Sequence, residues 1–134
     1  MKWNKNKIKK FIINCQVYPY DIFVFFGNDI SKLKIELSKL LPKEDIDDFD
    51  NLTFNGTGKS VMFPNNQTLL WLKYEPREPE LLGTLNHEIF HCACFILERA
   101  GIKYSEDSDE AFAYLIGYLT HAIYSRLGIF NKKK

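Results

Sequence analysis

Three side chains within five consecutive positions have the types and the spacing of a metal-dependent hydrolytic site. They are His87, Glu88 and His91, which form an H-E-x-x-H sequence. On an α-helix, positions i and i+4 lie on one face, so the two imidazoles can bind a single zinc ion. Glu88 would then be the general base that takes a proton from the metal-bound water. The alternative is a helix on which two histidines occur by chance.

The helix that carries this motif is expected to be buried, because apolar residues lie on nearly all of its faces between positions 81 and 97. An unpartnered polar group in such a place costs about 1–3 kcal/mol. One metal ion would satisfy both imidazoles and the carboxylate, directly or through its water. The composition of the helix therefore favours a bound metal.

A catalytic zinc usually has three protein ligands and one water, and the third ligand must come from outside the motif helix. Cys94 shares the helical stripe of the histidines, as does Glu98. At a rise of 1.5 Å per residue, however, Cys94 lies about 10 Å along the axis from His87, too far for both to bind one ion. The third histidine of a metzincin is also missing, because Leu97 stands at its position.

Glu110 is the best candidate for the third ligand. It is expected in the first turn of the next helix, and eighteen residues separate it from His91. His121 is expected about 16 Å further along that helix, where it would be a surface or packing residue. Three nearby carboxylates remain alternatives to Glu110, namely Glu106, Asp107 and Asp109.

The motif followed by a glutamate resembles the gluzincin class of zinc metallopeptidases. The sequence Asp-Glu-Ala-Phe-Ala at 109–113 is also similar to the second motif of ImmA/IrrE-type peptidases. The resemblance covers about residues 81–127, and the first half of the chain agrees in the order of its strands and helices. Thermolysin-type enzymes have an Asp four residues after the glutamate ligand, where this chain has Tyr114. Residues 109–119 and the chain length also resemble uncharacterised phage-encoded proteins.

This resemblance implies a zincin-like fold in which His87, His91 and Glu110 hold zinc and Glu88 activates water for attack on a peptide carbonyl. Residues 68–74 would be the edge strand that pairs with an extended peptide substrate. The oxyanion also needs a donor, and Tyr114 is the predicted one. Two other tyrosines, Tyr104 and Tyr118, remain alternatives.

The pattern of the whole chain predicts a small α+β domain with a short twisted sheet. Strands are expected within residues 11–26, as one long or two short segments, and at 68–74. One covering helix is expected over residues 30–41, capped by Asn28 or Asp29 and ended by Pro42. The motif helix should run over residues 79–100, and the glutamate-bearing C-terminal helix over residues 109–127.

Two other segments resemble ligand-binding motifs but fail their requirements. The acidic segment 44–50 lacks the alternating ligands and central glycine of an EF-hand, so we expect a solvated loop. Residues 55–60, Asn-Gly-Thr-Gly-Lys-Ser, end like a phosphate-binding loop, but the leading glycine is replaced by Thr53 and the following residues look like a strand. We interpret them as a turn between short strands at 52–54 and 61–63.

Composition and charge favour one folded domain, residues 1–134, in a reducing cytoplasm. The chain is 46% hydrophobic, and its three cysteines do not form a disulfide framework. No apolar run reaches the length of about 18 residues that a membrane span needs. Eight of the eighteen basic residues lie within residues 1–10 and 129–134, which we expect to be loose termini. The rest of the chain has a net charge of −7, which argues against a surface that binds nucleic acid.

These observations lead to one main functional hypothesis and two alternatives. The main hypothesis is zinc-dependent hydrolysis of a peptide or protein substrate. A second is a non-catalytic binding or regulatory module with a structural zinc site. A third is a zinc hydrolase that acts on another substrate, because a chain of 134 residues lacks the second domain that usually walls a peptidase cleft.

Overall fold

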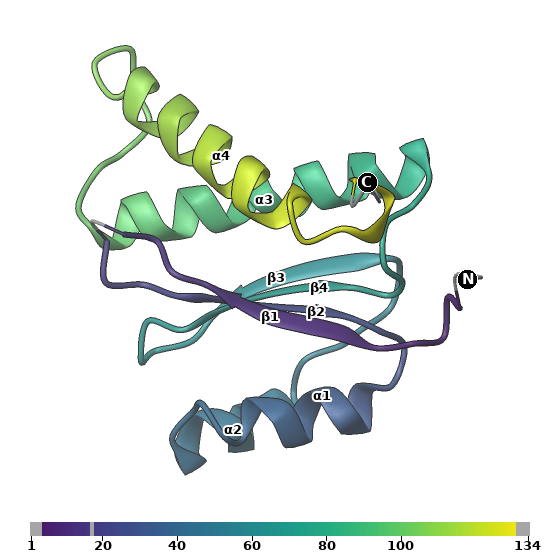
Figure 1. Ribbon diagram of the computed structural model, residues 1–134. Coiled ribbons are helices and arrows are strands. Elements are labelled where there is room, and N and C mark those ends of the chain that lie inside the picture. Colours follow the sequence, from purple (N-terminus) through teal and green to yellow (C-terminus); the bar gives the residue numbers. More distant parts are fainter. Residues whose placement is uncertain (1–3, 17, 131–134) are drawn as a thin grey trace.

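The computed structural model describes residues 4–16 and 18–130. It has three layers, with a four-stranded mixed sheet between a pair of short helices on one face and a pair of long helices on the other (Figure 1). This confirms the expected α+β class. Zincin-like details of the fold stay a prediction.

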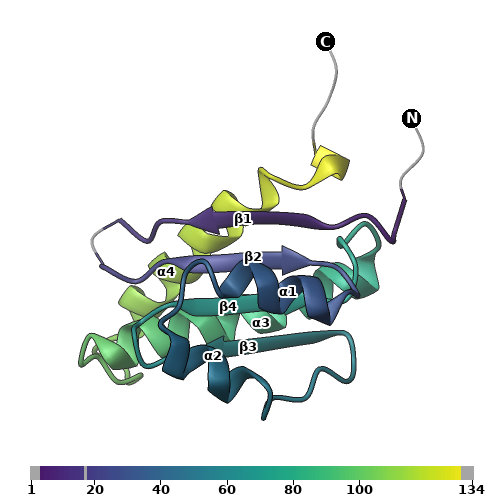
Figure 2. The same cartoon turned by 90° about the horizontal axis from the view of Figure 1, so that it is seen from below.

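The sheet has the order β1-β2-β4-β3, with β1 at Lys9–Ile13, β2 at Ile22–Phe26, β3 at Gly58–Met62 and β4 at Thr68–Leu72. The central strands β2 and β4 are parallel, and each outer strand is antiparallel to its neighbour. Figure 2 shows the four strands side by side in this order. All five residues of β2 and of β4 are buried, as expected for strands covered on both faces.

The expectation that residues 68–74 form the edge strand is wrong. These residues include β4, which lies between β2 and β3. Its unbroken apolar sequence TLLWL suits a central strand, whereas all five residues of β3 are only half-buried. The segment expected to be a turn at 55–60 instead contributes the first half of β3. Residues 52–54 form no strand.

The lower layer contains two helices where one was expected, namely α1 at Ile30–Leu37 and α2 at Lys43–Phe49. Asp29 caps α1 by accepting a hydrogen bond of 3.0 Å from the backbone N–H of Lys32. The segment expected to be a solvated acidic loop forms α2. Two acidic residues in its first turn favour the helix N-terminus, and Phe49 anchors it in the core. This core also contains Phe23, Phe25, Leu33, Leu37, Leu41, Phe63, Leu69 and Trp71.

The upper layer consists of the motif helix α3, Pro79–Arg99, and the last helix α4, Asp109–Tyr124, followed by a 3₁₀ turn at Gly128–Phe130. Pro79 starts α3 as predicted. Gly101 follows the helix with φ +87°, and the N–H of Ile102 bonds the carbonyl of Leu97 at 2.8 Å. The last helix ends at Tyr124, three residues earlier than expected. Figure 1 shows α4 crossing α3 at an angle.

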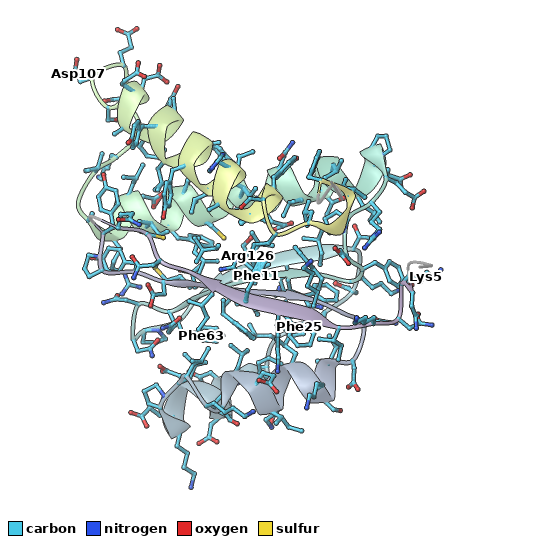
Figure 3. The ribbon with its side chains drawn as sticks, viewed as in Figure 1. Lys5, Phe11, Phe25, Phe63, Asp107 and Arg126 are labelled. Carbon is cyan, nitrogen blue, oxygen red and sulfur yellow. The ribbon has the colours of Figure 1, made fainter. Side chains whose placement is uncertain are left out.

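The first strand begins earlier than the sequence suggested, because Lys9 and Lys10 belong to β1 rather than to a loose terminus. Lys10 contacts the buried carboxylate of Glu36 at 2.9 Å. At the other end of the chain, the guanidinium of Arg126 lies 4.9 Å from the ring centre of Phe11 (Figure 3). Residues 129 and 130, also expected to be loose, belong to the 3₁₀ turn Gly128–Phe130. Residues 1–3 and 131–134 of the expected loose termini lie outside the described part of the chain. None of the described helices combines the length and the apolar composition needed to cross a membrane.

Candidate metal and catalytic site

The two motif histidines face each other on α3. Their Nε2 atoms lie 3.1 Å apart, and their ring planes are inclined at 76°. Zinc–nitrogen bonds of about 2.0–2.1 Å in tetrahedral geometry place two ligand nitrogens about 3.3 Å apart. The same distance also suits a hydrogen bond between a protonated and an unprotonated ring nitrogen. The pair is therefore spaced as two ligands of one metal ion would be.

The motif helix is not buried on all sides, which corrects the expectation from its composition. Its buried face contacts the sheet and α4, but Phe90 is 49% exposed and His87 is exposed. His91 is half-buried. Water can therefore satisfy the His87 ring, and burial does not by itself require a metal there. The exposed position of His87 would, however, give water and substrate access to an ion bound at the pair.

Glu88 points in another direction, toward β3, and is only 6% exposed. Ser60, in the middle of β3, donates a hydrogen bond of 2.5 Å to Oε1 of Glu88. The thiol of Cys92 donates in turn to the Ser60 Oγ at 3.8 Å. Burial raises the pKa of Cys92, so its thiol stays protonated at neutral pH. The buried carboxylate is thus the acceptor at the end of a short chain of hydrogen bonds.

Gly58 allows β3 to approach Glu88 closely. A Cβ atom at this position would lie 2.9 Å from Cγ2 of Thr84 and 3.2 Å from Oε2 of Glu88. Side chains two residues apart on a strand point to the same face, so Gly58 and Ser60 both face α3. The edge strand therefore meets one side of the Glu88 carboxylate with a hydroxyl and the other with a glycine.

The pairing of β3 with β4 leaves defined backbone groups at the free edge. The N–H of Phe63 bonds the carbonyl of Gln67 at 2.8 Å, and the N–H of Lys73 bonds that of Thr57 at 2.9 Å. In an antiparallel pair these hydrogen-bonded positions recur at every second residue. The intervening residues turn their N–H and C=O groups away from β4, and these are Gly58, Ser60 and Met62. The backbone beside Glu88 is thus available to a further strand.

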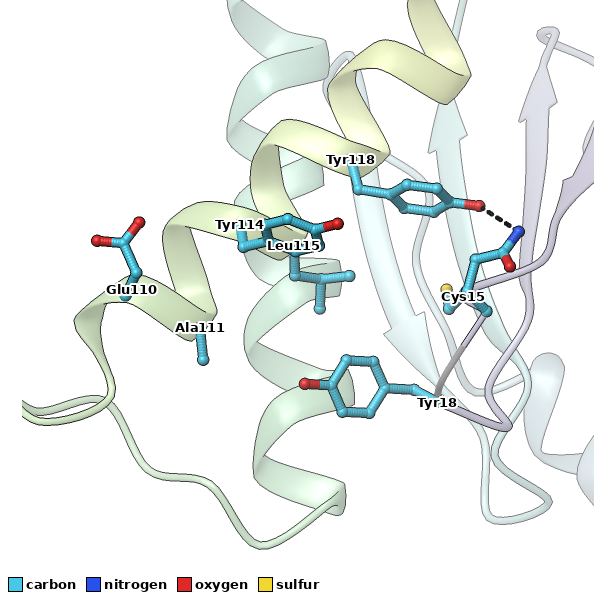
Figure 4. Close-up of a pocket in the computed structure, with 8 residues that line it drawn as sticks. Cys15, Tyr18, Glu110, Ala111, Tyr114, Leu115 and Tyr118 are labelled. Carbon is cyan, nitrogen blue, oxygen red and sulfur yellow. Dashed lines mark hydrogen bonds between the residues drawn. The ribbon is translucent and has the colours of Figure 1, made fainter.

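The structure does not bring the predicted third ligand to the histidines. Glu110 and Tyr114 lie on α4 and line a pocket of about 680 Å³ against the β1–β2 connection (Figure 4). Within residues 4–16 and 18–130, no three or more His, Cys, Asp or Glu side chains gather closely enough to hold a metal ion. This also applies to the alternative ligands Glu106, Asp107 and Asp109.

The predicted oxyanion donor and its two alternatives also lie at other places than the motif histidines. Tyr114 is 78% exposed at the pocket of Figure 4. Tyr104 donates to Asp109 at 2.8 Å, and Tyr118 donates to the backbone carbonyl of Asn14 at 2.7 Å. The contacts of Tyr104 and Tyr118 therefore hold the α3–α4 and β1–β2 connections.

Sequence reasoning missed Gly58 and Ser60, because the segment was interpreted as a turn. The sequence Gly-Lys-Ser-Val-Met at 58–62 has no two-residue alternation of polar and apolar residues, because Lys59 is polar as well, so no local pattern marks this strand. Comparisons with protein-family models, with curated proteins and with solved structures gave no match.

Proposed function

We propose that this domain is a zinc-dependent peptidase whose reacting groups lie on α3, with Glu88 packed against the edge strand β3. The observation that carries the proposal is the pairing of two facing imidazoles with a carboxylate held by an edge strand. His87 and His91 are spaced as ligands of one ion. Glu88 lies on the side of the same helix that faces β3, and a hydrogen bond from Ser60 fixes its carboxylate.

His87 and His91 would hold the zinc ion through their Nε2 atoms. When bound, zinc polarises a carbonyl and lowers the pKa of its water to about 7. The spacing of the two histidines fits a zinc ion, but no third ligand among the described residues lies close to them. Glu110 remains our proposed third ligand because of the resemblance to gluzincins, although its carboxylate lines a different pocket.

Glu88 would act as the general base with one of its two oxygens. Ser60 occupies Oε1. Oε2 lies beside Gly58, 3.2 Å from the point where a Cβ atom of that residue would stand. A carboxylate with one oxygen fixed by a hydrogen bond has a defined orientation, which is what general-base catalysis needs. The proton that Glu88 takes from water would then pass to the leaving amine.

The substrate would be an extended peptide added to the free edge of β3. The N–H and C=O groups of Gly58, Ser60 and Met62 point to that edge, and such edges bind peptides through main-chain hydrogen bonds. A peptide in this position would run past Glu88. Its backbone would be recognised at every second residue, so the edge itself would select for an extended main chain rather than for a particular side chain.

The exposure of His87 bears on the alternative of a structural zinc site. Structural zinc ions are enclosed by four protein ligands, whereas catalytic ions keep one position open to water. His87 is exposed. This exposure favours an open site over a closed structural one.

The test combines metal analysis with a peptide-library cleavage assay on the untagged protein. We expect about one zinc per chain and cleavage that is lost by several orders of magnitude in Glu88→Gln, which keeps the shape of the side chain but removes the base. Glu98→Gln, at an exposed position of the same helix, should cleave normally. A zinc-free protein of equal stability, or full activity in Glu88→Gln, would contradict the proposal.

A further inference from the structure

A concave site lies between α4 and the β1–β2 connection. It encloses about 680 Å³, a volume typical of small-molecule sites. Three tyrosines line it, namely Tyr18 from the connection and Tyr114 and Tyr118 from α4. In Figure 4, Tyr18 extends toward α4 and Tyr118 extends toward the connection, so rings reach across the pocket from both sides. Leu115 lies between the two tyrosines of α4.

The wall of this pocket is held in place by hydrogen bonds. The Tyr118 hydroxyl donates to the carbonyl of Asn14 at 2.7 Å and accepts from the Gln16 side chain at 3.3 Å. Gln16 has a positive φ of 60°, and its N–H bonds the side chain of Asn14 at 2.8 Å. The ring of Tyr118 is therefore fixed without the help of a ligand. Tyr114, by contrast, is 78% exposed.

The charges of the lining favour a cation. Among the described residues that line the pocket there is no lysine, arginine or histidine, and the only ionic carboxylate is that of Glu110. The faces of tyrosine rings carry partial negative charge and attract quaternary and alkyl ammonium groups. Ala111 and Leu115 add apolar surface for the carbon atoms of such a ligand.

We propose that this pocket binds a small ligand with an alkylammonium group, held against the faces of Tyr18, Tyr114 and Tyr118. The site is separate from the motif histidines, and its charge argument uses Glu110 where the structure has it, lining this pocket. Because the three rings supply the recognition, removing one of them should weaken binding, and removing the positive charge of the ligand should weaken it as well.

The test uses choline as the probe and 3,3-dimethylbutan-1-ol, which has the same shape without the charge, as its partner. Both are titrated into ¹⁵N-labelled protein and followed by NMR. We expect saturable shifts for choline around Gln16 and Leu115, and a dissociation constant about two- to thirtyfold higher for the neutral alcohol. Equal binding of the two compounds, or no saturable shift with choline, would overturn the proposal.

Two variants assign the binding to the pocket. Tyr114→Leu removes an exposed ring and should raise the dissociation constant for choline about two- to thirtyfold without unfolding the protein. Tyr104→Leu is the matched control, since Tyr104 is 65% exposed on the α3–α4 connection and does not line the pocket. An equal loss in both variants would also overturn the proposal. Neither variant changes the motif residues or Glu110.

Discussion

The hydroxyl of Ser60 donates a hydrogen bond of 2.5 Å to the Glu88 carboxylate and so joins the edge strand to the motif helix. The carboxylate is 6% exposed, so water does little to replace this bond. A buried acceptor that loses its partner costs about 1–3 kcal/mol. The contact therefore contributes both to the packing of β3 on α3 and to the orientation of the proposed base.

We expect Ser60→Ala to lower peptide cleavage about ten- to a hundredfold while zinc content stays the same, because Glu88 loses its orientation but the histidines are unchanged. The free energy of unfolding should fall by about 1–3 kcal/mol. Ser60→Thr keeps the hydroxyl and should restore most of the cleavage. Activity and zinc content measured on the same preparations check this, and an Ala variant as active as the parent would contradict it.

Gly58→Ala should destabilise the protein, because its new methyl group would meet Thr84 and Glu88 at 2.9 and 3.2 Å. Overpacking of this kind costs about 1–3 kcal/mol. Gly83→Ala is the control, since it lies on α3 with nothing within 4 Å and should be stabilising or neutral. Adding Thr84→Ser to Gly58→Ala removes the closest contact and should recover part of the loss. Chemical denaturation of the four proteins measures these differences.

Glu36 should make the stability depend on pH in the acid range. The hydrogen bond from Lys10, opposed by partial burial and aided by Lys39, lowers the pKa of Glu36 from 4.5 to about 2. A carboxylate with a lowered pKa in the folded state stabilises the protein above its unfolded pKa, and this stability is lost as the pH falls through the folded value. The free energy of unfolding of the parent should therefore exceed that of Glu36→Gln by a constant amount above about pH 5, and this difference should shrink between pH 4.5 and 2.

The measurement is the free energy of unfolding of the parent and of Glu36→Gln across this range. Glu44→Gln, at an exposed position of α2, is the control and should change little. A difference between the parent and Glu36→Gln that grows as the pH falls would show that the lysines do not stabilise the charged form.

The sequence correctly predicted the helix bounds that local residues determine. It did not predict the features that depend on how distant segments pack together. Pro79 and Gly101 set the bounds of α3 through local backbone chemistry, so those bounds were correct. The order of the strands depends on which faces are covered, and the apolar run of β4 was not recognised as a sign of a central strand. From the resemblance to gluzincins we expected residues 68–74 at the edge of the sheet, but the strand at the edge beside α3 is β3.

The candidate site also has parts that follow from local sequence and parts that depend on tertiary packing. The spacing of His87 and His91 on one helix is local, and their Nε2 atoms meet at 3.1 Å as that spacing predicts. The role of Ser60 depends on the packing of β3 against α3, across 28 positions of the sequence. The direction in which Glu110 points depends on how α4 crosses α3, which no periodicity in the sequence encodes.

Glu110 is the residue on which the proposed zinc site depends most. It lies in the first turn of α4, where a negative charge is favoured by about 0.3–1 kcal/mol even without a metal. If it is the third ligand, Glu110→Gln should lower zinc affinity sharply, because two histidines alone would hold the ion. The loss of stability in this variant should then be much larger in the presence of zinc than after chelation. Glu106→Gln and Asp109→Asn, in the same acidic segment, should have neither effect. Zinc binding measured by calorimetry on the three variants decides between them, and a variant other than Glu110→Gln that loses the metal would reassign the ligand while leaving the histidine pair in place.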